Sequence, residues 1–168
     1  MVEHHRHRAR EIGPLTFGVL TISDSKSSED DASGGRIVEL LVAAGHSVGR
    51  REIVKDDPGS IRGAVAGFLT DRNVQAVVTS GGTGVTSRDV TPEALAPLAE
   101  KRLEGFGELF RAISHREVRG AAMLSRAFVF VALGKPVFCL PGSPDAVSLA
   151  MRELVVPEAG HIVAELRR

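Results

Sequence analysis

A glycine-rich loop from Ser80 to Asp89 is the segment of this sequence best suited to chemistry. It follows a run of β-favouring residues and places three glycines within four positions. Glycine readily adopts positive φ, so successive backbone N–H groups can turn inward and form a nest for an anion. No Lys-Ser/Thr pair follows the glycines, which excludes a Walker A loop, and the spacing differs from a dinucleotide fingerprint. The loop predicts a phosphate site, with a plain tight turn as the alternative. The residues expected to contact phosphate or nucleotide are Ser80, Gly81, Gly82, Thr83, Gly84 and Arg88.

Two aspartates are candidates to hold a metal ion beside this loop. Asp89 lies just before a helix start at Thr91, where its plainer role is to complement the helix dipole. Asp56 ends a strand, whereas its neighbour Asp57 precedes Pro58 and should cap the following helix. Mg²⁺ is usually bound by one or two carboxylates together with waters and substrate phosphates. We therefore predict that Asp89 and Asp56, from separate loops, together hold one Mg²⁺.

Two further loops are candidates for the same site. The segment from Pro141 to Pro144 is a rigid turn at a helix start, where the helix N-terminus can hold an anion. Ser143 can donate a hydrogen bond there, although an ordinary N-cap is an equally good interpretation. Ser23 and Asp24 follow the first strand and carry a weaker signal. Asp31, further along, could simply cap the next helix.

Strands and helices alternate along the chain and must position these loops. Runs of β-favouring residues predict strands at 15–22, 46–54, 74–79, 128–133 and 136–140, the last two joined as a hairpin by Gly134 and Lys135. Apolar residues at helical spacing and cap-plus-proline signals predict the helices. These are a helix over 37–44 that ends at Gly45, one from Pro58 to Leu69, one opened by Thr91-Pro92-Glu93, a helical region over 95–125, one capped by Ser143, and a final helix over 157–166.

This alternation predicts a three-layer α/β/α sandwich around a mostly parallel sheet, with one antiparallel strand at an edge. Ligands of such sheets bind outside the carboxyl ends of the strands. The loops that directly follow strands should therefore meet on one rim. Those loops are 23–25, 55–57, 80–89 and 141–143.

The composition excludes several other classes of protein. A chain of 168 residues suits one domain, which we place at 15–168 after a flexible tail at 1–14. Lys+Arg and Asp+Glu both number 21, and Trp and Tyr are absent, so neither charge nor base stacking favours nucleic acid. No secretory signal is visible, and the longest apolar run, 127–133, is too short to cross a bilayer. We therefore predict a cytoplasmic protein that binds neither nucleic acid nor membrane.

Several motifs within residues 17–156 carry a resemblance to a known family. They are Ile22-Ser-Asp-Ser25, Asp31-Ala-Ser-Gly34, Ser80-Gly-Gly-Thr-Gly84, Arg88-Asp-Val-Thr-Pro-Glu-Ala94, Gly105-Phe-Gly-Glu-Leu-Phe-Arg111, Leu124-Ser-Arg126 and Leu140-Pro-Gly-Ser-Pro144. In this order they resemble the molybdopterin-binding family of molybdenum cofactor biosynthesis. Several spaced motifs in order are far more specific than any one alone.

The resemblance implies an activity in which Mg²⁺ and ATP adenylylate the terminal phosphate of molybdopterin and pyrophosphate is released. It makes Asp89 and Asp56 the catalytic acidic residues and the loop from Gly81 to Gly84 the phosphate cradle. Some members of one branch lack the Arg-Asp pair after this loop and are inactive, so Arg88 and Asp89 favour an active enzyme. The residues implied on the molybdopterin side are Ser23, Asp24, Pro141, Gly142 and Ser143.

The resemblance also implies a homotrimer or homohexamer that passes its product to a molybdenum-insertion protein. Two alternatives stay open. One is a protein that binds molybdopterin without chemistry, and the other is a nucleotide pyrophosphatase like the related competence domain. The binding protein would bind molybdopterin without consuming ATP, and the pyrophosphatase would hydrolyse a nucleotide diphosphate sugar without any pterin present.

Overall fold

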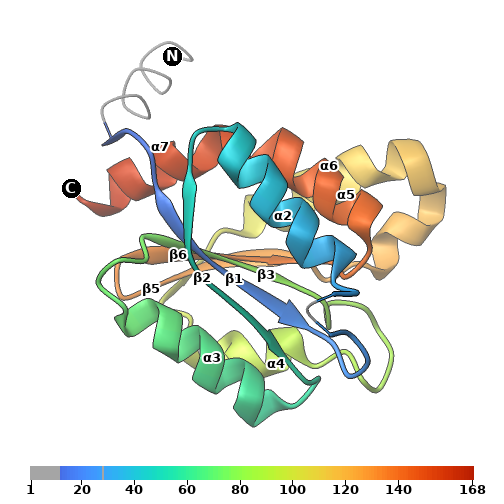
Figure 1. The fold of residues 1–168 in the computed structure, drawn as a ribbon. Coiled ribbons are helices and arrows are strands. Elements are labelled where there is room, and N and C mark those ends of the chain that lie inside the picture. The colour runs from blue at the N-terminus through green and yellow to red at the C-terminus, as the bar shows by residue number, and fades with distance from the viewer. Residues whose placement is uncertain (1–11, 28) are drawn as a thin grey trace.

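One six-stranded sheet organises the computed structural model, which describes residues 12–27 and 29–168 (Figure 1). The strands are β1 (Thr16–Ile22), β2 (Ser47–Val54), β3 (Ala76–Ser80), β4 (Lys101–Arg102), β5 (Phe128–Ala132) and β6 (Lys135–Leu140). Their order across the sheet is β2-β1-β3-β6-β5-β4. Strands β2, β1, β3 and β6 pair in parallel, whereas β5 is antiparallel to β6 and to the two-residue β4. The mostly parallel sheet with an antiparallel strand toward one edge is therefore confirmed.

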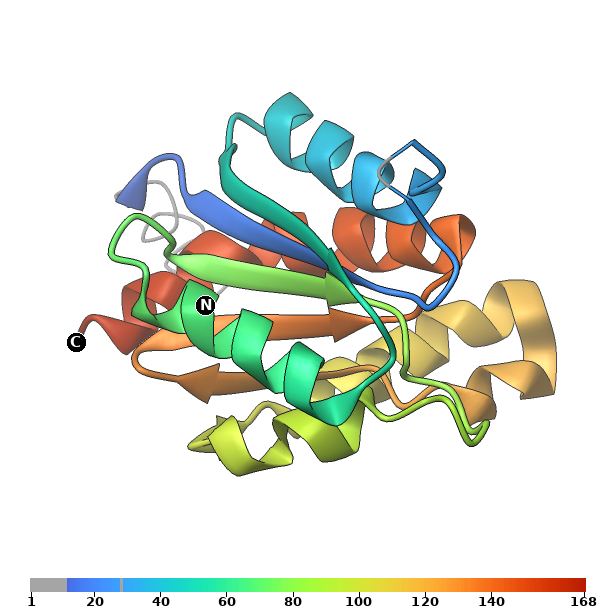
Figure 2. The same ribbon diagram turned by 60° about the horizontal axis from the view of Figure 1, so that its bottom comes forward.

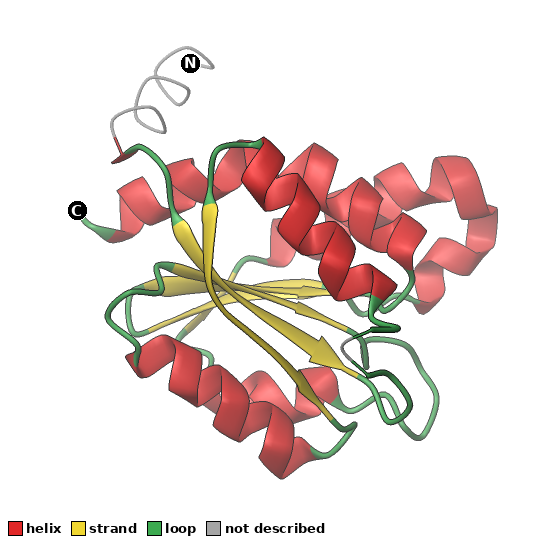
Figure 3. Ribbon diagram, viewed as in Figure 1, coloured by secondary structure: helices red, strands yellow, loops and turns green. Residues whose placement is uncertain are grey.

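Helices cover both faces of this sheet, as Figures 2 and 3 show. The helices are α2 (Ala32–Ala43), α3 (Pro58–Thr70), α4 (Thr91–Leu95), α5 (Glu104–Val118), α6 (Pro144–Ala150) and α7 (Val156–Leu166). Apolar side chains of α2, α5, α6 and α7 form one core cluster with one face of the sheet. Those of α3 and α4 form a second cluster with the other face. The three-layer sandwich is confirmed.

The predicted helical region over 95–125 is wrong near its beginning, where β4 interrupts it. The backbone N–H groups of Glu100 and Leu103 donate to the carbonyls of Val131 and Val129, at 2.9 Å each. These bonds extend the sheet and outweigh the local helical preference of the segment, because tertiary context routinely overrides propensity. On either side the chain is helical, with short 3₁₀ turns η1 (Ala96–Leu98) and η2 (Arg119–Leu124).

The last two predicted helices are joined without a break. A π-helical turn, η3 (Met151–Val155), connects α6 to α7. Pro157 has no backbone N–H, so it cannot complete the α-helical ladder, and a π-turn is a common adjustment inside a helix. Across this turn Val155 is fully buried in the first core cluster, whereas Leu154 is only partly buried.

The structure bears on only part of the predicted division into a tail at 1–14 and a domain at 15–168. Most of the predicted tail, residues 1–11, lies outside the described residues. Ile12, at its end, packs against the first core cluster. The single domain over 15–168 stays a prediction. Within the described residues, no helix combines the length and the apolar character that crossing a bilayer requires.

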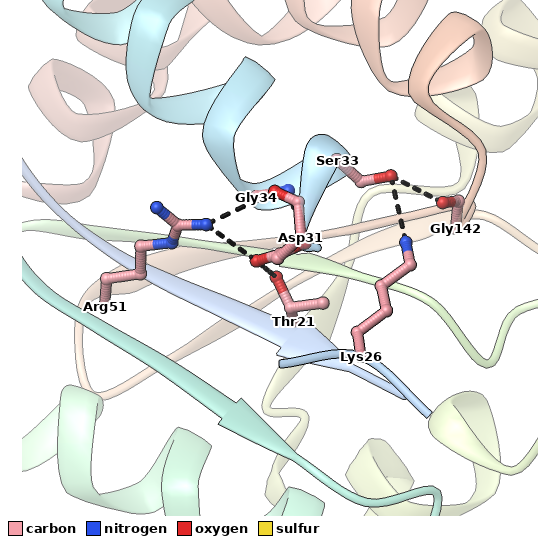
Figure 4. Close-up of polar contacts among 7 residues, drawn as sticks. All are labelled: Thr21, Lys26, Asp31, Ser33, Gly34, Arg51 and Gly142. Carbon is pink, nitrogen blue, oxygen red and sulfur yellow. Dashed lines mark hydrogen bonds and ion pairs between the residues drawn. The ribbon is translucent and has the colours of Figure 1, made fainter. Parts of the chain in front are cut away.

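A buried aspartate ties two neighbouring strands to the start of α2 (Figure 4). Asp31 accepts hydrogen bonds from the Thr21 hydroxyl at 2.6 Å and the Gly34 N–H at 2.9 Å, and its carboxylate lies 2.9 Å from the Arg51 guanidinium. The expected N-cap is thus confirmed, and the residue does more than cap. Burial raises the pKa of Asp31, but these three partners outweigh it and hold the pKa below the ordinary value.

We expect Asp31→Ala to lower the free energy of unfolding by roughly 3 kcal/mol, because Thr21 and Arg51 lose their shared acceptor inside the protein. The depressed pKa means that the folded state favours the ionised carboxylate. Its stabilisation is therefore present above the ordinary pKa of 3.8 and is lost as the pH falls through the lower folded-state pKa. Urea unfolding at neutral and acid pH measures both effects.

The exposed neighbour Asp30 provides a matched control for this prediction, because Asp30→Ala makes the same change in charge. That variant should stay within about 0.5 kcal/mol of the parent protein. Equal losses in the two variants would show that the buried contacts of Asp31 do not stabilise the fold.

Candidate functional site

The loops that follow β1, β2, β3 and β6 enclose a pocket of about 530 Å³ at the carboxyl edge of the sheet. This size is typical of sites for small molecules. The pocket is lined by Ile22, Ser23, Lys26, Asp56, Ser80, Gly81, Gly82, Thr83, Gly84, Arg88, Asp89, Leu124, Ser125, Pro141, Gly142 and Ser143. Every site residue predicted from the sequence is among them except Asp24, which lines the adjoining hollow on the same rim.

Two successive residues of the glycine loop have a backbone conformation that glycine adopts readily and other residues rarely adopt. Gly81 and Gly82 have φ of +109° and +67°, in the left-handed region. A Cβ on Gly81 would lie 2.2 Å from the carbonyl oxygen of Ile22, so only glycine fits at this position. The loop is pinned from outside, because the Gly81 N–H donates to Leu140 at 3.0 Å and the Gly81 carbonyl accepts from the Thr91 hydroxyl at 2.9 Å.

This contact corrects the role expected for Thr91. Helix α4 begins at Thr91 as predicted, but the Thr91 side chain does not cap it. Its hydroxyl donates to Gly81, and its backbone N–H donates to the Gly82 carbonyl at 3.0 Å. Thr91 is fully buried and therefore fixes the glycine loop to the start of α4.

Ser80 offers the pocket an unused polar group. Ser80 lines the pocket, and its buried hydroxyl has no hydrogen-bond partner within the described residues. Buried polar atoms are nearly always satisfied, so an orphan at a pocket wall calls for a ligand or a water. A phosphate oxygen is a suitable acceptor for this hydroxyl.

Asp89 is held against the glycine loop in its ionised form. Its carboxylate accepts from the Thr86 N–H at 2.8 Å and from the Thr86 hydroxyl at 2.6 Å. Partial burial raises the pKa of Asp89, but the bonds from Thr86 and from the Gly84 N–H, together with the charge of Arg126, bring it below the ordinary value. The carboxylate is thus both fixed in place and negatively charged at neutral pH.

Asp56 has the opposite environment. Burial and then the negative charge of Asp24 raise its pKa above the ordinary value, and Asp89 adds to this effect. The Asp24 backbone N–H donates to the Asp56 carboxylate, and with the charge of Arg88 it offsets part of this rise. A carboxylate whose pKa is raised by burial and by neighbouring negative charges is well suited to a cation.

These two carboxylates fit a Mg²⁺ ion in part. No cluster of three or more His, Cys, Asp or Glu side chains suited to a metal occurs in the part of the chain described. Asp56 and Asp89 line the same pocket, so the remaining ligands would be waters and substrate phosphate. That mixed shell is the one Mg²⁺ usually takes.

Asp24 and Arg88 form an ion pair across the mouth of the pocket. The Arg88 Nε donates to Asp24 at 3.0 Å, and a second guanidinium nitrogen donates to the same oxygen. The hydrogen bond from Arg88 lowers the pKa of Asp24, as does a bond from the Asp56 N–H at 3.1 Å. Arg88 therefore reaches the pocket, as predicted, but its guanidinium is engaged by a residue that we had expected on the molybdopterin side.

The loop before α6 caps that helix and also lines the pocket, so the N-cap is confirmed and the anion site stays a prediction. Ser143 caps α6 by accepting from the Ala146 N–H at 3.4 Å, and it also lines the pocket. The neighbouring Gly142 carbonyl accepts from the Ser33 hydroxyl at 2.6 Å, which joins this loop to the start of α2 (Figure 4).

Four lining residues were not among the predicted site residues: Ile22, Lys26, Leu124 and Ser125. The Lys26 amino group donates to Ser33 at 3.4 Å and brings a positive charge to the pocket wall. A search of the rim loops for cations would have found it. Leu124 and Ser125 precede β5, and because β5 is antiparallel its beginning lies at the edge where the other strands end.

The sandwich, with its pocket where the parallel strands end, defines an α/β domain of the kind that binds a ligand at this end of its sheet. The chain belongs to the molybdopterin-binding family of molybdenum cofactor biosynthesis: residues 18–161 match the family described as probable molybdopterin binding domain.

Individual relatives agree with this assignment. The chain is 47% identical to molybdenum cofactor biosynthesis protein B of Bacillus cereus over 169 aligned positions, covering 100% of this chain and 98% of the relative. It is 42% identical to the protein of the same name from Bacillus subtilis, covering 99% and 98%. A crystal structure of molybdenum cofactor biosynthesis protein B has a TM-score of 0.90 and 49% identity, covering 92% of this chain and 97% of that one.

Proposed function

We propose that this chain is a molybdopterin adenylyltransferase, which uses Mg²⁺ and ATP to transfer AMP to the terminal phosphate of molybdopterin. The observation that carries the proposal is the meeting of a glycine nest with two carboxylates, Asp56 and Asp89, in one pocket. A protein that only stores molybdopterin needs the glycine loop. It does not need two carboxylates in one pocket whose pKa values are shifted in opposite directions. The family assignment supports molybdopterin as the ligand.

The reaction needs positioning more than it needs a nucleophilic side chain. An oxygen of the molybdopterin phosphate attacks the α-phosphorus of ATP, and the bond from that phosphorus to the pyrophosphate oxygen breaks. The Gly81 and Gly84 N–H groups already donate to Leu140 and Asp89. The Gly82 and Thr83 N–H groups and the Ser80 hydroxyl would donate to phosphate oxygens, and Lys26 would add positive charge. Mg²⁺ held by Asp56 and Asp89 would neutralise charge on the transferring phosphate.

The molybdopterin end of the pocket would be formed by the loops after β1 and β6. Ser23 and the segment from Pro141 to Ser143 line that part of the wall. Asp24 would act indirectly, because its carboxylate accepts hydrogen bonds from both Arg88 and the Asp56 backbone N–H. ATP consumption fits a cytoplasmic location.

The direct test mixes the purified chain with molybdopterin and Mg·ATP and measures pyrophosphate. We expect one pyrophosphate per molybdopterin, with none when molybdopterin or Mg²⁺ is omitted. Molybdopterin binding without pyrophosphate release would favour the binding-only alternative. Hydrolysis of a nucleotide diphosphate sugar without any pterin would favour the pyrophosphatase.

Asp56→Asn supplies the control for that assay. It should abolish Mg²⁺-dependent release without lowering the melting temperature, because the raised pKa shows that the ionised carboxylate opposes folding. A variant that loses both release and stability would instead assign Asp56 a structural role.

We also propose that the chain forms a homotrimer or homohexamer and hands its product to a molybdenum-insertion protein. Exposed apolar side chains on α5 and η2 support self-association, since such groupings commonly mark protein contacts. Figure 1 shows these two segments projecting at one end of the molecule. The side chains are Leu109, Val118, Met123 and Leu124, which are 51–77% exposed in the single chain.

A further inference from the structure

A single arginine braces the loop that carries Asp89. The Arg126 Nε donates to the Gly84 carbonyl at 2.7 Å, and its Nη2 donates to the Asp89 carbonyl at 2.8 Å. Its Nη1 pairs with Glu93, and its backbone N–H donates to the Thr83 carbonyl at 2.8 Å. One residue just before β5 thus contacts both ends of the loop and the first turn of α4.

The effect on the pocket follows from the planarity of the peptide bond. In a trans peptide unit the carbonyl of one residue and the N–H of the next point in opposite directions. Because Arg126 holds the Thr83 carbonyl, the Gly84 N–H points the other way, and it donates to the Asp89 carboxylate. By the same geometry, the hydrogen bonds from Arg126 to the Gly84 and Asp89 carbonyls fix the orientation of the peptide unit that follows each of these residues.

We propose that Arg126 is a positioning residue for AMP transfer, holding the Asp89 carboxylate and the glycine-loop amides in register. This inference rests on the proposed adenylyltransferase function. Arg126 does not line the pocket, so it acts through the loop without touching the substrate. Only a guanidinium suits the task, because its planar fork presents several donors at fixed angles and an ammonium group is a single point.

Arg126→Lys tests the proposal, with Glu93→Gln as the matched control that removes only the side-chain partner. We expect Arg126→Lys to lower kcat roughly 100-fold, the cost of misplacing a reacting group by about 1 Å. The KM for molybdopterin should stay within about twofold, since the loops expected to bind it are untouched. Glu93→Gln should keep both parameters close to those of the parent protein.

Amide hydrogen exchange gives a readout independent of activity. Exchange at residues 84–90 should speed up on the order of tenfold in Arg126→Lys, because charge-assisted hydrogen bonds are lost. Exchange in β1 and β3 should not change, which also shows that the variant is folded. Arg126→Gln serves as a second variant with the same expectations.

The possible outcomes distinguish the bracing role of Arg126 from the proposed adenylyltransferase function. Unchanged exchange at 84–90 together with an unchanged kcat would overturn the bracing role, as would an equal loss in Glu93→Gln. If the parent protein releases no pyrophosphate, the proposed function fails, while faster exchange at 84–90 would still establish that Arg126 holds the loop.

Discussion

Asp89→Ala is expected to reduce pyrophosphate release at least 100-fold while leaving the protein folded. The carboxylate is fixed by Thr86 and ionised, so it can stabilise charge at the transferring phosphate without rearranging; removing a preorganised electrostatic group of this kind costs roughly 10²–10³ in rate. The Thr86 donors can turn to water, because the contact is at the surface. Initial rates with saturating Mg·ATP and molybdopterin measure the effect.

Two comparison variants make this result specific. Asp145→Ala removes an exposed carboxylate at the start of α6 that does not line the pocket, and it should retain a rate within about twofold. Asp89→Asn keeps the shape of the side chain and should be nearly as slow as Asp89→Ala, because the charge is what matters. Normal turnover by either Asp89 variant would exclude this carboxylate from the reaction.

Gly81→Ala is expected to lower the free energy of unfolding by about 3 kcal/mol and to abolish AMP transfer. Two effects add: a positive φ costs an L-residue roughly 1–3 kcal/mol, and the new Cβ would lie 2.2 Å from the Ile22 carbonyl oxygen. That oxygen belongs to the end of β1 and cannot move aside as a flexible side chain would. Urea unfolding and pyrophosphate release measure the two losses.

Gly63→Ala is the matched control for this substitution. Gly63 lies on α3, and a Cβ there would meet nothing within 4 Å. Alanine should therefore raise the free energy of unfolding by about 0.5–1 kcal/mol and leave transfer unchanged. If Gly81→Ala behaved like Gly63→Ala, the glycine loop would not depend on its left-handed backbone.

Local patterns in the sequence were enough to predict five of the six strands and the end of the sheet where the candidate site lies. The strand before Ser80, the cap at Asp57 and the turn before Ser143 are each determined by residues close in sequence. Parallel pairing then brings the loops to one edge by a general rule of α/β sheets. This is why nearly all of the predicted residues line one pocket.

The features that were missed depend on long-range contacts. Arg88 meets Asp24, which lies 64 residues away, and neither position alone indicates the other. A long side chain has many rotamers, and only the tertiary neighbours select one. The two-residue β4 likewise exists because its flanking N–H groups find β5, which its own sequence does not reveal.

The two ends of the sheet differ in how well they tolerate changes in sequence, as the hairpin between β5 and β6 illustrates. Its turn, Leu133 and Gly134, lies at the edge opposite the pocket, with both residues at positive φ and Leu133 exposed. The turn at Gly45 lies at that same edge. Insertions and sequence drift can accumulate there over evolution without reaching the reacting groups, whereas a length change in any loop of the carboxyl rim would shift a wall of the pocket.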